Sequence, residues 1–413
     1  MPCRIEPRPE APRPQAPLPD SLTWLEDSLR RLETDGLVRP HRVRHGRQGR
    51  LVELNGRELL NFGANDYLGY AGDVRLTRSC SKGSCAEGFG SGASPLVSGH
   101  SLAHETLEAA IASLVQTEAA LVFPSGFAAN TATIPTLVGE GDLIVSDERN
   151  HASIIDGCRL SRARLLVYPH RDLTSLVAQL EAAAPARRLL IVTDSLFSMD
   201  GTVAPLADLC EIAERFGAML MVDEAHATGV FGARGSGLVE ASGCEADVPI
   251  RIGTLSKALG SAGGFVAGPA SLIHWLRHAA RAWVFSTAHP PGVAAAATTA
   301  ITLLQEEPFR RRELLEKASH FRHQLAASRP TTHATPVGRT ASGDASQIVP
   351  VVVGTPEKAV ALSEALAAAG FFVPAIRPPS VPRDGSLVRV SLSWHHTEED
   401  LTRLATAITS HLS

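Results

Sequence analysis

Hydrophobic and polar positions along this chain alternate in a way that predicts strands and helices in turn. Apolar runs of four or five residues predict seven β-strands, and helical stretches fall between them. The strands are expected near 119–123, 142–146, 164–168, 189–193, 218–222, 250–253 and 264–267. Strands that alternate with helices indicate an α/β fold, with a mainly parallel sheet covered by helices on both faces.

The pattern changes towards both ends of the chain. Residues 1–20 contain seven prolines and little hydrophobic periodicity, so we expect a disordered Pro-rich tail. Leucines at helical spacing follow, and then a small hairpin over 50–62 that turns at Asn55-Gly56. Beyond residue 305, a charged helix precedes strands expected at 347–353, 371–375 and 387–393, with further helices at 356–369 and 397–412. We therefore expect a tail over 1–20, an N-terminal helix and hairpin over 21–64, a large domain over 65–304 and a smaller α+β C-terminal domain over 305–413.

Composition narrows the class of protein. The 413 residues are 44% apolar and 20% charged, with a net charge of −4 and no block of like charge, so nothing favours binding to nucleic acid or an anionic membrane. No apolar run approaches the length of a membrane span, and the first residues lack the pattern of a secretory signal. The six cysteines are scattered and do not form the two pairs of a zinc site. We expect a cytoplasmic protein with reduced thiols, no metal, no membrane partner and no nucleic-acid partner.

Candidate chemistry gathers where two predicted strands end. Asp223 follows an apolar run, His226 comes three residues later, and Lys257 follows the next run among Ser, Ala, Leu and Gly. Ligands of open α/β sheets bind at the ends of strands. A partly desolvated lysine has a lowered pKa and can act as an amine nucleophile. Our first hypothesis is a Schiff-base lysine at position 257, with Asp223 holding a protonated pyridine nitrogen.

Other segments carry weaker signals. The Gly- and Ser-rich loop at 88–101 could approach a ligand by its backbone, and the helix that opens at Gly126 could bind a phosphate. Taken alone, each is more typical of an ordinary loop or a capped helix. The same holds for His151, which a surface turn would explain, and for Arg39, which a solvated basic turn would explain.

Eight motifs occur together and in a specific order. They are N-D-Y-L-G (65–69), G-S-G-A-S-P-L-V-S-G-H (90–100), S-G-F-A-A-N (125–130), N-H-A-S (150–153), F-S-M-D-G (197–201), V-D-E-A-H-A-T-G (222–229), T-L-S-K (254–257) and F-S-T (285–287). Through them the chain resembles the α-oxoamine synthases, which are pyridoxal 5'-phosphate (PLP) enzymes of fold type I. The resemblance runs from about Leu22 to the C-terminus.

This resemblance implies a role for each matching residue. Lys257 would hold PLP covalently, Asp223 would pair with its ring nitrogen, and His226 would bond its phenolic oxygen. His151 would stack on the ring and lie near the substrate, so the implied catalytic residues are Lys257, His151 and Asp223. Further contacts to PLP are implied for Gly126, Phe127, Ser198, Thr254, Ser286 and Thr287, the last two from a second subunit of a homodimer. Substrate contacts are implied for Arg39, His151, Arg377 and Ser380, with Arg389 as a second candidate for the amino-acid carboxylate.

The substrate is suggested by the segment A-I-R-P-P-S-V-P (375–382). It resembles the subgroup that condenses L-alanine with a pimeloyl thioester, carried by coenzyme A or by acyl carrier protein. Three alternatives remain open from the residues alone. They are a sister synthase such as glycine C-acetyltransferase, another fold-type-I enzyme such as an aminotransferase, and a non-catalytic binding module that keeps the fold.

Overall fold

The computed structural model describes residues 19–327 and 346–412, and the chain divides into two compact units, 1–41 and 42–413. The first unit contains a short 3-10 turn, η1 (Asp20–Leu22), and the helix α1 (Trp24–Thr34). A helix is therefore present where the leucine spacing predicted one. The predicted Pro-rich tail lies outside the described residues as far as residue 18.

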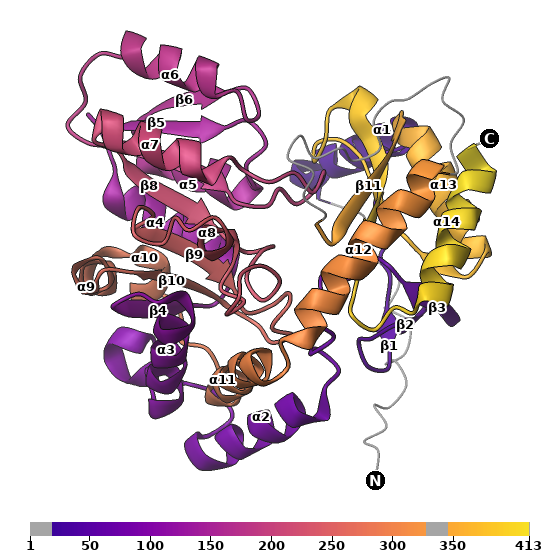
Figure 1. Ribbon diagram of the computed structural model, residues 1–413, viewed down its shortest axis with the longest axis horizontal. Helices are drawn as coiled ribbons and strands as arrows, with labels where there is room; N and C mark the ends of the chain where they lie inside the picture. Colours follow the sequence, from indigo (N-terminus) through magenta and orange to yellow (C-terminus); the bar gives the residue numbers. More distant parts are fainter. Residues whose placement is uncertain (1–18, 328–345, 413) are drawn as a thin grey trace. The chain divides into compact units, whose positions relative to one another are not determined.

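The second unit contains a seven-stranded sheet (Figure 1). All seven strands occur where the apolar runs predict them, and this confirms the α/β fold. The strands are β4 (Ala119–Phe123), β5 (Leu143–Asp147), β6 (Arg164–Tyr168), β7 (Leu189–Asp194), β8 (Met219–Asp223), β9 (Ile250–Thr254) and β10 (Gly264–Gly268). Their order is β4-β10-β9-β8-β7-β5-β6, and only β10 runs antiparallel to its neighbours, β4 and β9. The carboxyl ends of the other six strands therefore lie at one edge.

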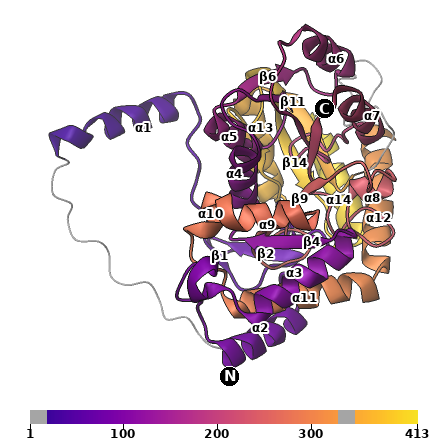
Figure 2. The same cartoon turned by 90° about the vertical axis from the view of Figure 1, so that its left-hand side faces the viewer.

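Helices cover both faces of this sheet. They are α2 (Val74–Glu87), α3 (Leu102–Val115), α4 (Gly126–Leu137), α5 (Ala152–Ser161), α6 (Leu173–Ala182), α7 (Leu206–Phe216), α8 (Leu238–Ala241), α9 (Ala270–Ala279), α10 (Arg281–Val284) and α11 (Pro291–Glu306), with a π-helical turn η2 (Pro95–Gly99). Successive strand residues point to opposite faces. Met221 of β8 packs in a core with α4, α5 and α9, whereas Leu220 and Val222 pack in a second core with α3, α7 and α11. In both views α11 lies beside α2 and α3 (Figures 1 and 2).

Two smaller sheets complete the second unit. One contains β1 (Arg44–His45), β2 (Leu51–Leu54), β3 (Arg57–Asn61) and β12 (Phe371–Phe372), and the other contains β11 (Ile348–Gly354), β13 (Ala375–Ile376) and β14 (Ser386–Ser391). The helices α12 (Phe309–Ala327), α13 (Pro356–Ala368) and α14 (Glu398–Leu412), with a 3-10 turn η3 (Arg383–Gly385), accompany them. The predicted hairpin turns at Asn55-Gly56, where both residues have the positive φ of a two-residue turn. The domain boundaries proposed at 64 and 304 remain predictions.

One strand prediction is wrong in its extent. The segment 371–375 was expected to be a single strand, but β12 and β13 are separate and pair in different sheets, with β3 and β14 respectively. Pro374 lies between them and has no N–H to donate to a strand ladder. Among the described residues, no helix is both long and apolar enough to cross a membrane.

Candidate active site

Side chains from four strand ends meet at the carboxyl edge of the seven-stranded sheet. Asp194 ends β7 and Asp223 ends β8, and the two residues are register partners. Lys257 follows β9 by three residues, and His151 follows β5 by four. Strands of a parallel sheet that end together bring distant parts of the chain to one place. The sheet thus gathers the three residues for which catalytic roles are implied.

The Lys257 amine lies in a desolvated and electrostatically mixed environment. Burial lowers the pKa of Lys257 to about 8, and the nearby cation Arg389 also lowers it. Asp223 and Asp194 act in the opposite direction and raise this pKa. Because desolvation is the largest of these effects, about a tenth of the amine is neutral at pH 7, far more than for a solvated lysine. A neutral amine is the form that attacks a carbonyl group or accepts a proton.

A line of buried hydrogen bonds joins Asp223 to His151. Asn130 Nδ2 donates to Asp223 Oδ2 at 2.6 Å and to Ser153 Oγ at 2.9 Å. Ser153 Oγ lies 2.7 Å from His151 Nδ1. The N–H of Ala225 donates to the second carboxylate oxygen of Asp223 at 2.8 Å. Asp223 is therefore fixed in orientation from two sides.

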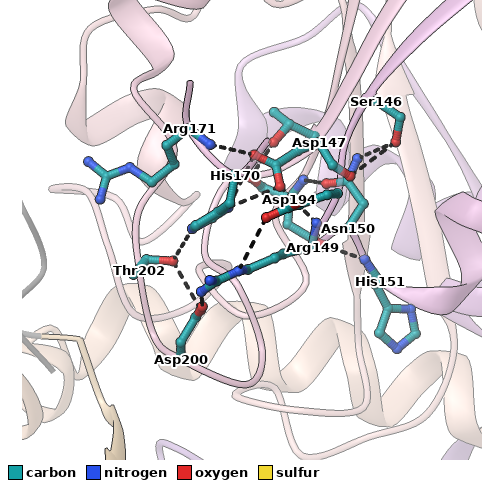
Figure 3. A network of polar contacts seen from close by, with 12 residues as sticks. Ser146, Asp147, Arg149, Asn150, His151, His170, Arg171, Asp194, Asp200 and Thr202 are labelled. Atoms are coloured by element: carbon teal, nitrogen blue, oxygen red, sulfur yellow. Dashed lines mark hydrogen bonds and ion pairs between the residues drawn. The ribbon is translucent and has the colours of Figure 1, made fainter. Parts of the chain in front are cut away.

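The backbone of His151 is anchored by a polar network around the β5–α5 loop (Figure 3). The N–H of His151 donates to Asp194 Oδ2 at 2.7 Å, and the N–H of Asp194 donates to Asn150 Oδ1 at 2.8 Å. In the same network, Asp147 accepts from the N–H of Arg149 at 2.8 Å and contacts His170 Nδ1 at 3.0 Å. Figure 3 shows the ring of His151 standing clear of this network. These hydrogen bonds hold the backbone of the β5–α5 loop in place at His151.

His226 lies in a second buried polar cluster. Its Nδ1 is 2.7 Å from the hydroxyl of Tyr67, and its carbonyl oxygen accepts from Gln347 Nε2 at 2.7 Å. Burial, with the charge of Lys257 as the next cause, holds the pKa of His226 well below its usual range. Burial also raises the pKa of Tyr67 to about 12. Both rings are therefore neutral at neutral pH, and Nε2 is the nitrogen of His226 left for a ligand.

The start of α4 lies close to β9 and β10. Ser125 caps this helix by accepting from the N–H of Ala128 at 3.0 Å, and the first N–H groups of a helix have no acceptor within it. A Cβ atom at Gly264 would lie 2.4 Å from the nitrogen of Gly126, so only glycine allows β10 this close to the helix start. Thr254 ends β9 next to Gly126 and donates its hydroxyl to the carbonyl of Gly263 at 2.8 Å. This cradle suits an anionic oxygen.

Four further residues with predicted roles are Ser198, Arg377, Ser380 and Phe127. Arg389 NH1 donates to the carbonyl of Ser198 at 3.0 Å, so Ser198 belongs to the same edge of the site. Arg377 is half-buried, and Ser380 is exposed and donates its N–H to the carbonyl of Arg377 at 3.1 Å. The side chain of Phe127 is 47% exposed at the start of α4.

The contacts described above do not connect three residues with predicted roles, Ser286, Thr287 and Arg39, to the Lys257 amine. Ser286 and Thr287 line a small cavity together with His100 and Glu108, and their implied role towards a second subunit remains a prediction. Arg39 belongs to the unit 1–41, and its role at the acyl site likewise remains a prediction.

Four residues at the site received no role from the sequence: Asn130, Ser153, Tyr67 and Asp194. Asn130 follows Gly126 by one helical turn. Tyr67 lies in the motif N-D-Y-L-G (65–69), and Ser153 lies in the motif N-H-A-S (150–153). Their roles depend on contacts between segments far apart in the chain, as between Asn130 and Asp223. Asp194 offered a usable signal, because it directly follows the strand predicted at 189–193, and the next predicted strand along the chain leads to Asp223.

The residues of this edge fit PLP. Lys257 offers an amine to the aldehyde, and Asp223 offers a buried carboxylate to a protonated ring nitrogen. His226 offers a ring nitrogen to the phenolic oxygen. The cradle formed by Gly126, Thr254 and the close approach at Gly264 suits a phosphate.

Comparisons with known proteins agree with this fit. A family model described as aminotransferase class I and II matches residues 57–408. The 8-amino-7-oxononanoate synthase of Symbiobacterium thermophilum is 44% identical over 379 residues, which cover 92% of this chain and 94% of that protein. The 8-amino-7-oxononanoate synthase of Anaeromyxobacter dehalogenans is 46% identical over 376 residues, which cover 91% and 92%.

A solved structure supports the same assignment. The serine palmitoyltransferase of S. paucimobilis, determined with a bound PLP–myriocin adduct, superposes with a TM-score of 0.87 at 29% identity, covering 95% of this chain and 97% of that one. The fold, the residues gathered at the sheet edge and the similar proteins support the same family assignment. The chain belongs to the aminotransferase class I and II family and, within it, to the 8-amino-7-oxononanoate synthases.

Proposed function

We propose that this PLP-dependent acyltransferase condenses L-alanine with a pimeloyl thioester and releases carbon dioxide, forming 8-amino-7-oxononanoate for biotin biosynthesis. One observation carries the chemistry: the Lys257 amine, with a pKa lowered to about 8, lies under the influence of the buried carboxylate of Asp223. The names of the relatives, at 44–46% identity over most of the chain, support the product.

The roles of the chain's own residues follow from their surroundings. Bound PLP supplies an electron sink for negative charge that develops at the α-carbon of the amino acid. Asp223, oriented by Asn130 and Ala225, would hold the proton on the ring nitrogen that makes this sink effective. Lys257 Nζ would bind PLP at rest and accept and return the α-proton, because a base works best with a pKa near the working pH.

Two arginines are candidates for the carboxylate of L-alanine. Arg377 is the first choice from the resemblance. Arg389 is 7% exposed and close enough to lower the pKa of both Lys257 and His226. Buried arginine recognises a carboxylate through paired N–H groups. We propose that both contribute to binding the carboxylate, with Arg389 nearer the amine. Arg39 and Ser380 are proposed to contact the acyl chain.

We further propose that the chain works as a homodimer with shared active sites. Phe89, Val97 and Phe285 are 87%, 79% and 71% exposed, and Phe285 directly precedes Ser286 and Thr287. Exposed aromatic and aliphatic side chains of this size are typical of a surface that another chain covers. Sedimentation of the purified protein should give twice the 43.7 kDa chain mass, and Phe285→Asp should shift it towards the monomer.

A substrate matrix tests the proposed function. L-Alanine and glycine are each offered with pimeloyl-CoA, pimeloyl-acyl carrier protein and acetyl-CoA, and carbon dioxide and the amino ketone are measured. Turnover with L-alanine and either pimeloyl donor is expected. Turnover confined to glycine and acetyl-CoA would instead indicate a glycine C-acetyltransferase, and amino transfer to a keto acid would indicate an aminotransferase.

A further inference from the structure

The hydrogen bonds between Asp223 and His151 run through two side chains that are almost completely buried. Asn130 is 0% exposed and Ser153 is 1% exposed. They come from the helices α4 and α5, which pack against each other beside the sheet. Solvent therefore cannot substitute for either partner in this line.

The donors and acceptors available on these four side chains decide the direction of each hydrogen bond between Asp223 and His151. An ionised Asp223 can only accept, so Asn130 must present its amide nitrogen, and the 2.6 Å contact joins Nδ2 to Oδ2. The second N–H of the same amide donates to Ser153 Oγ at 2.9 Å. The hydroxyl proton of Ser153 is then free to donate to His151 Nδ1, 2.7 Å away.

A second donor reaches the same ring nitrogen. The backbone N–H of Ser153 donates to His151 Nδ1 at 3.3 Å, as in a helix cap. Burial lowers the pKa of His151, and the charge of Lys257 adds to this effect while Asp223 opposes it. The ring is therefore neutral at neutral pH, with one nitrogen protonated and the other accepting. Because Nδ1 accepts from Ser153, the proton of the neutral ring resides on Nε2.

We propose that Asn130 and Ser153 are positioning residues that transmit the charge of Asp223 to His151 and hold it in the Nε2–H tautomer. His151 then presents a hydrogen-bond donor to an oxygen of the bound substrate, either its carboxylate or the thioester carbonyl. The use of this donor rests on the proposed function, but the tautomer itself does not. The backbone bond to Asp194 fixes the position of His151 (Figure 3). The hydrogen bond from Ser153 fixes which ring nitrogen carries the proton.

The tautomer can be read directly by nitrogen-15 NMR of the imidazole rings in the PLP-loaded protein without substrate. The chain contains 16 histidines, so the signals of His151 are assigned by their loss in His151→Gln. The wild type should show the proton on Nε2. In Ser153→Ala the ratio of Nδ1–H to Nε2–H should rise about tenfold, which corresponds to losing one ordinary hydrogen bond. Asn130→Ala should act in the same direction, and Ser153→Thr, which keeps the hydroxyl, should restore the wild-type ratio.

Thr133→Val is the matched control. Thr133 is fully buried on the same helix as Asn130, and its hydroxyl has no hydrogen-bond partner among the described residues. This change should leave both the tautomer and kcat as they are, whereas Ser153→Ala should lower kcat about tenfold.

Two results would overturn the proposal: a wild-type ring protonated at Nδ1, or a tautomer ratio unchanged in both Ser153→Ala and Asn130→Ala. Since the spectra need no substrate, a protein with another acyl donor would still give the predicted tautomer. Failure of the substrate assay and failure of this inference can thus be told apart.

Discussion

Asp194 and Asp223 stand side by side as register partners at the ends of β7 and β8, so the sheet places two buried carboxyl groups at one edge. Burial, with the charge of Asp223 as the next cause, raises the pKa of Asp194 well above its usual range. Two neighbouring carboxyl groups accommodate one negative charge more easily than two. The two aspartates are therefore given different tasks: Asp194 anchors the backbone of His151, and Asp223 is proposed to pair with the ring nitrogen of PLP.

Matched substitutions at this pair should give unequal losses. Asp223→Asn removes the carboxylate that holds the ring proton and should lower kcat/KM about 10²–10³-fold, as expected for a lost electrostatic contact to developing charge. Asp194→Asn keeps an oxygen that can accept the N–H of His151, so its loss should stay below about tenfold. Equal losses in steady-state assays of the two variants would contradict this division of roles.

Lys257 should be the covalent attachment point for PLP. After borohydride reduction, mass spectrometry of the wild type should show one added cofactor, and Lys257→Ala should show none. Lys317→Ala is the control, because burial also lowers the pKa of Lys317 but its amine donates to the carbonyl of Trp394 at 2.7 Å. Labelling that survives in Lys257→Ala would refute the assignment.

The uptake of PLP by the apoprotein should depend on pH through Lys257. Its pKa lies at about 8 instead of 10.5, so the neutral and reactive amine accumulates as the pH rises through about 8. The initial rate of covalent binding, followed by absorbance, should rise over the same range. Asp223 raises this pKa, so Asp223→Asn should move the midpoint to lower pH. A midpoint near 10.5 in the wild type would show that the amine is solvated.

A methyl group at Gly264 should disturb the phosphate cradle. The added Cβ would lie 2.4 Å from the nitrogen of Gly126 and force β10 away from α4, at a cost of about 1–3 kcal/mol. We expect Gly264→Ala to weaken PLP binding about tenfold or more in titrations and to lower the melting temperature. In Gly139→Ala the nearest atom to the new Cβ is 3.7 Å away, so both quantities should remain at wild-type values.

Both candidate arginines should affect the binding of L-alanine. Arg389→Lys and Arg377→Lys should each raise KM for L-alanine, by about ten- to a hundredfold where a paired contact to the carboxylate is lost. The effect of Arg389→Lys should be the larger, because Arg389 also bonds Ser198 and Asn65. Arg57→Lys is the control, since Arg57 is exposed and donates to the carbonyl of Ala367. An unchanged KM in both variants would place the carboxylate elsewhere.

Local pattern was sufficient to predict most of the architecture. The seven strands of the main sheet are short apolar runs with helical stretches between them, and this pattern predicts buried parallel strands whatever their order. Local rules also explain the turn at Asn55-Gly56 and the helix that starts after Ser125. The predicted strand over 371–375 was wrong because pairing partners, together with Pro374, decide where a strand breaks.

The sequence by itself determined the residue types of the site and the strand ends on which they stand. Lys257 among small residues and Asp223 after an apolar run are local features, and so are the motifs that resemble one enzyme family. The tertiary structure alone decided which side chains meet. Asn130 reaches Asp223 across 93 positions, and Asp194 stands beside Asp223 only because β7 and β8 pair in register. Burial of Lys257 by the surrounding fold lowers its pKa to about 8, and desolvation of this kind is a property of packed neighbours rather than of adjacent residues in the chain.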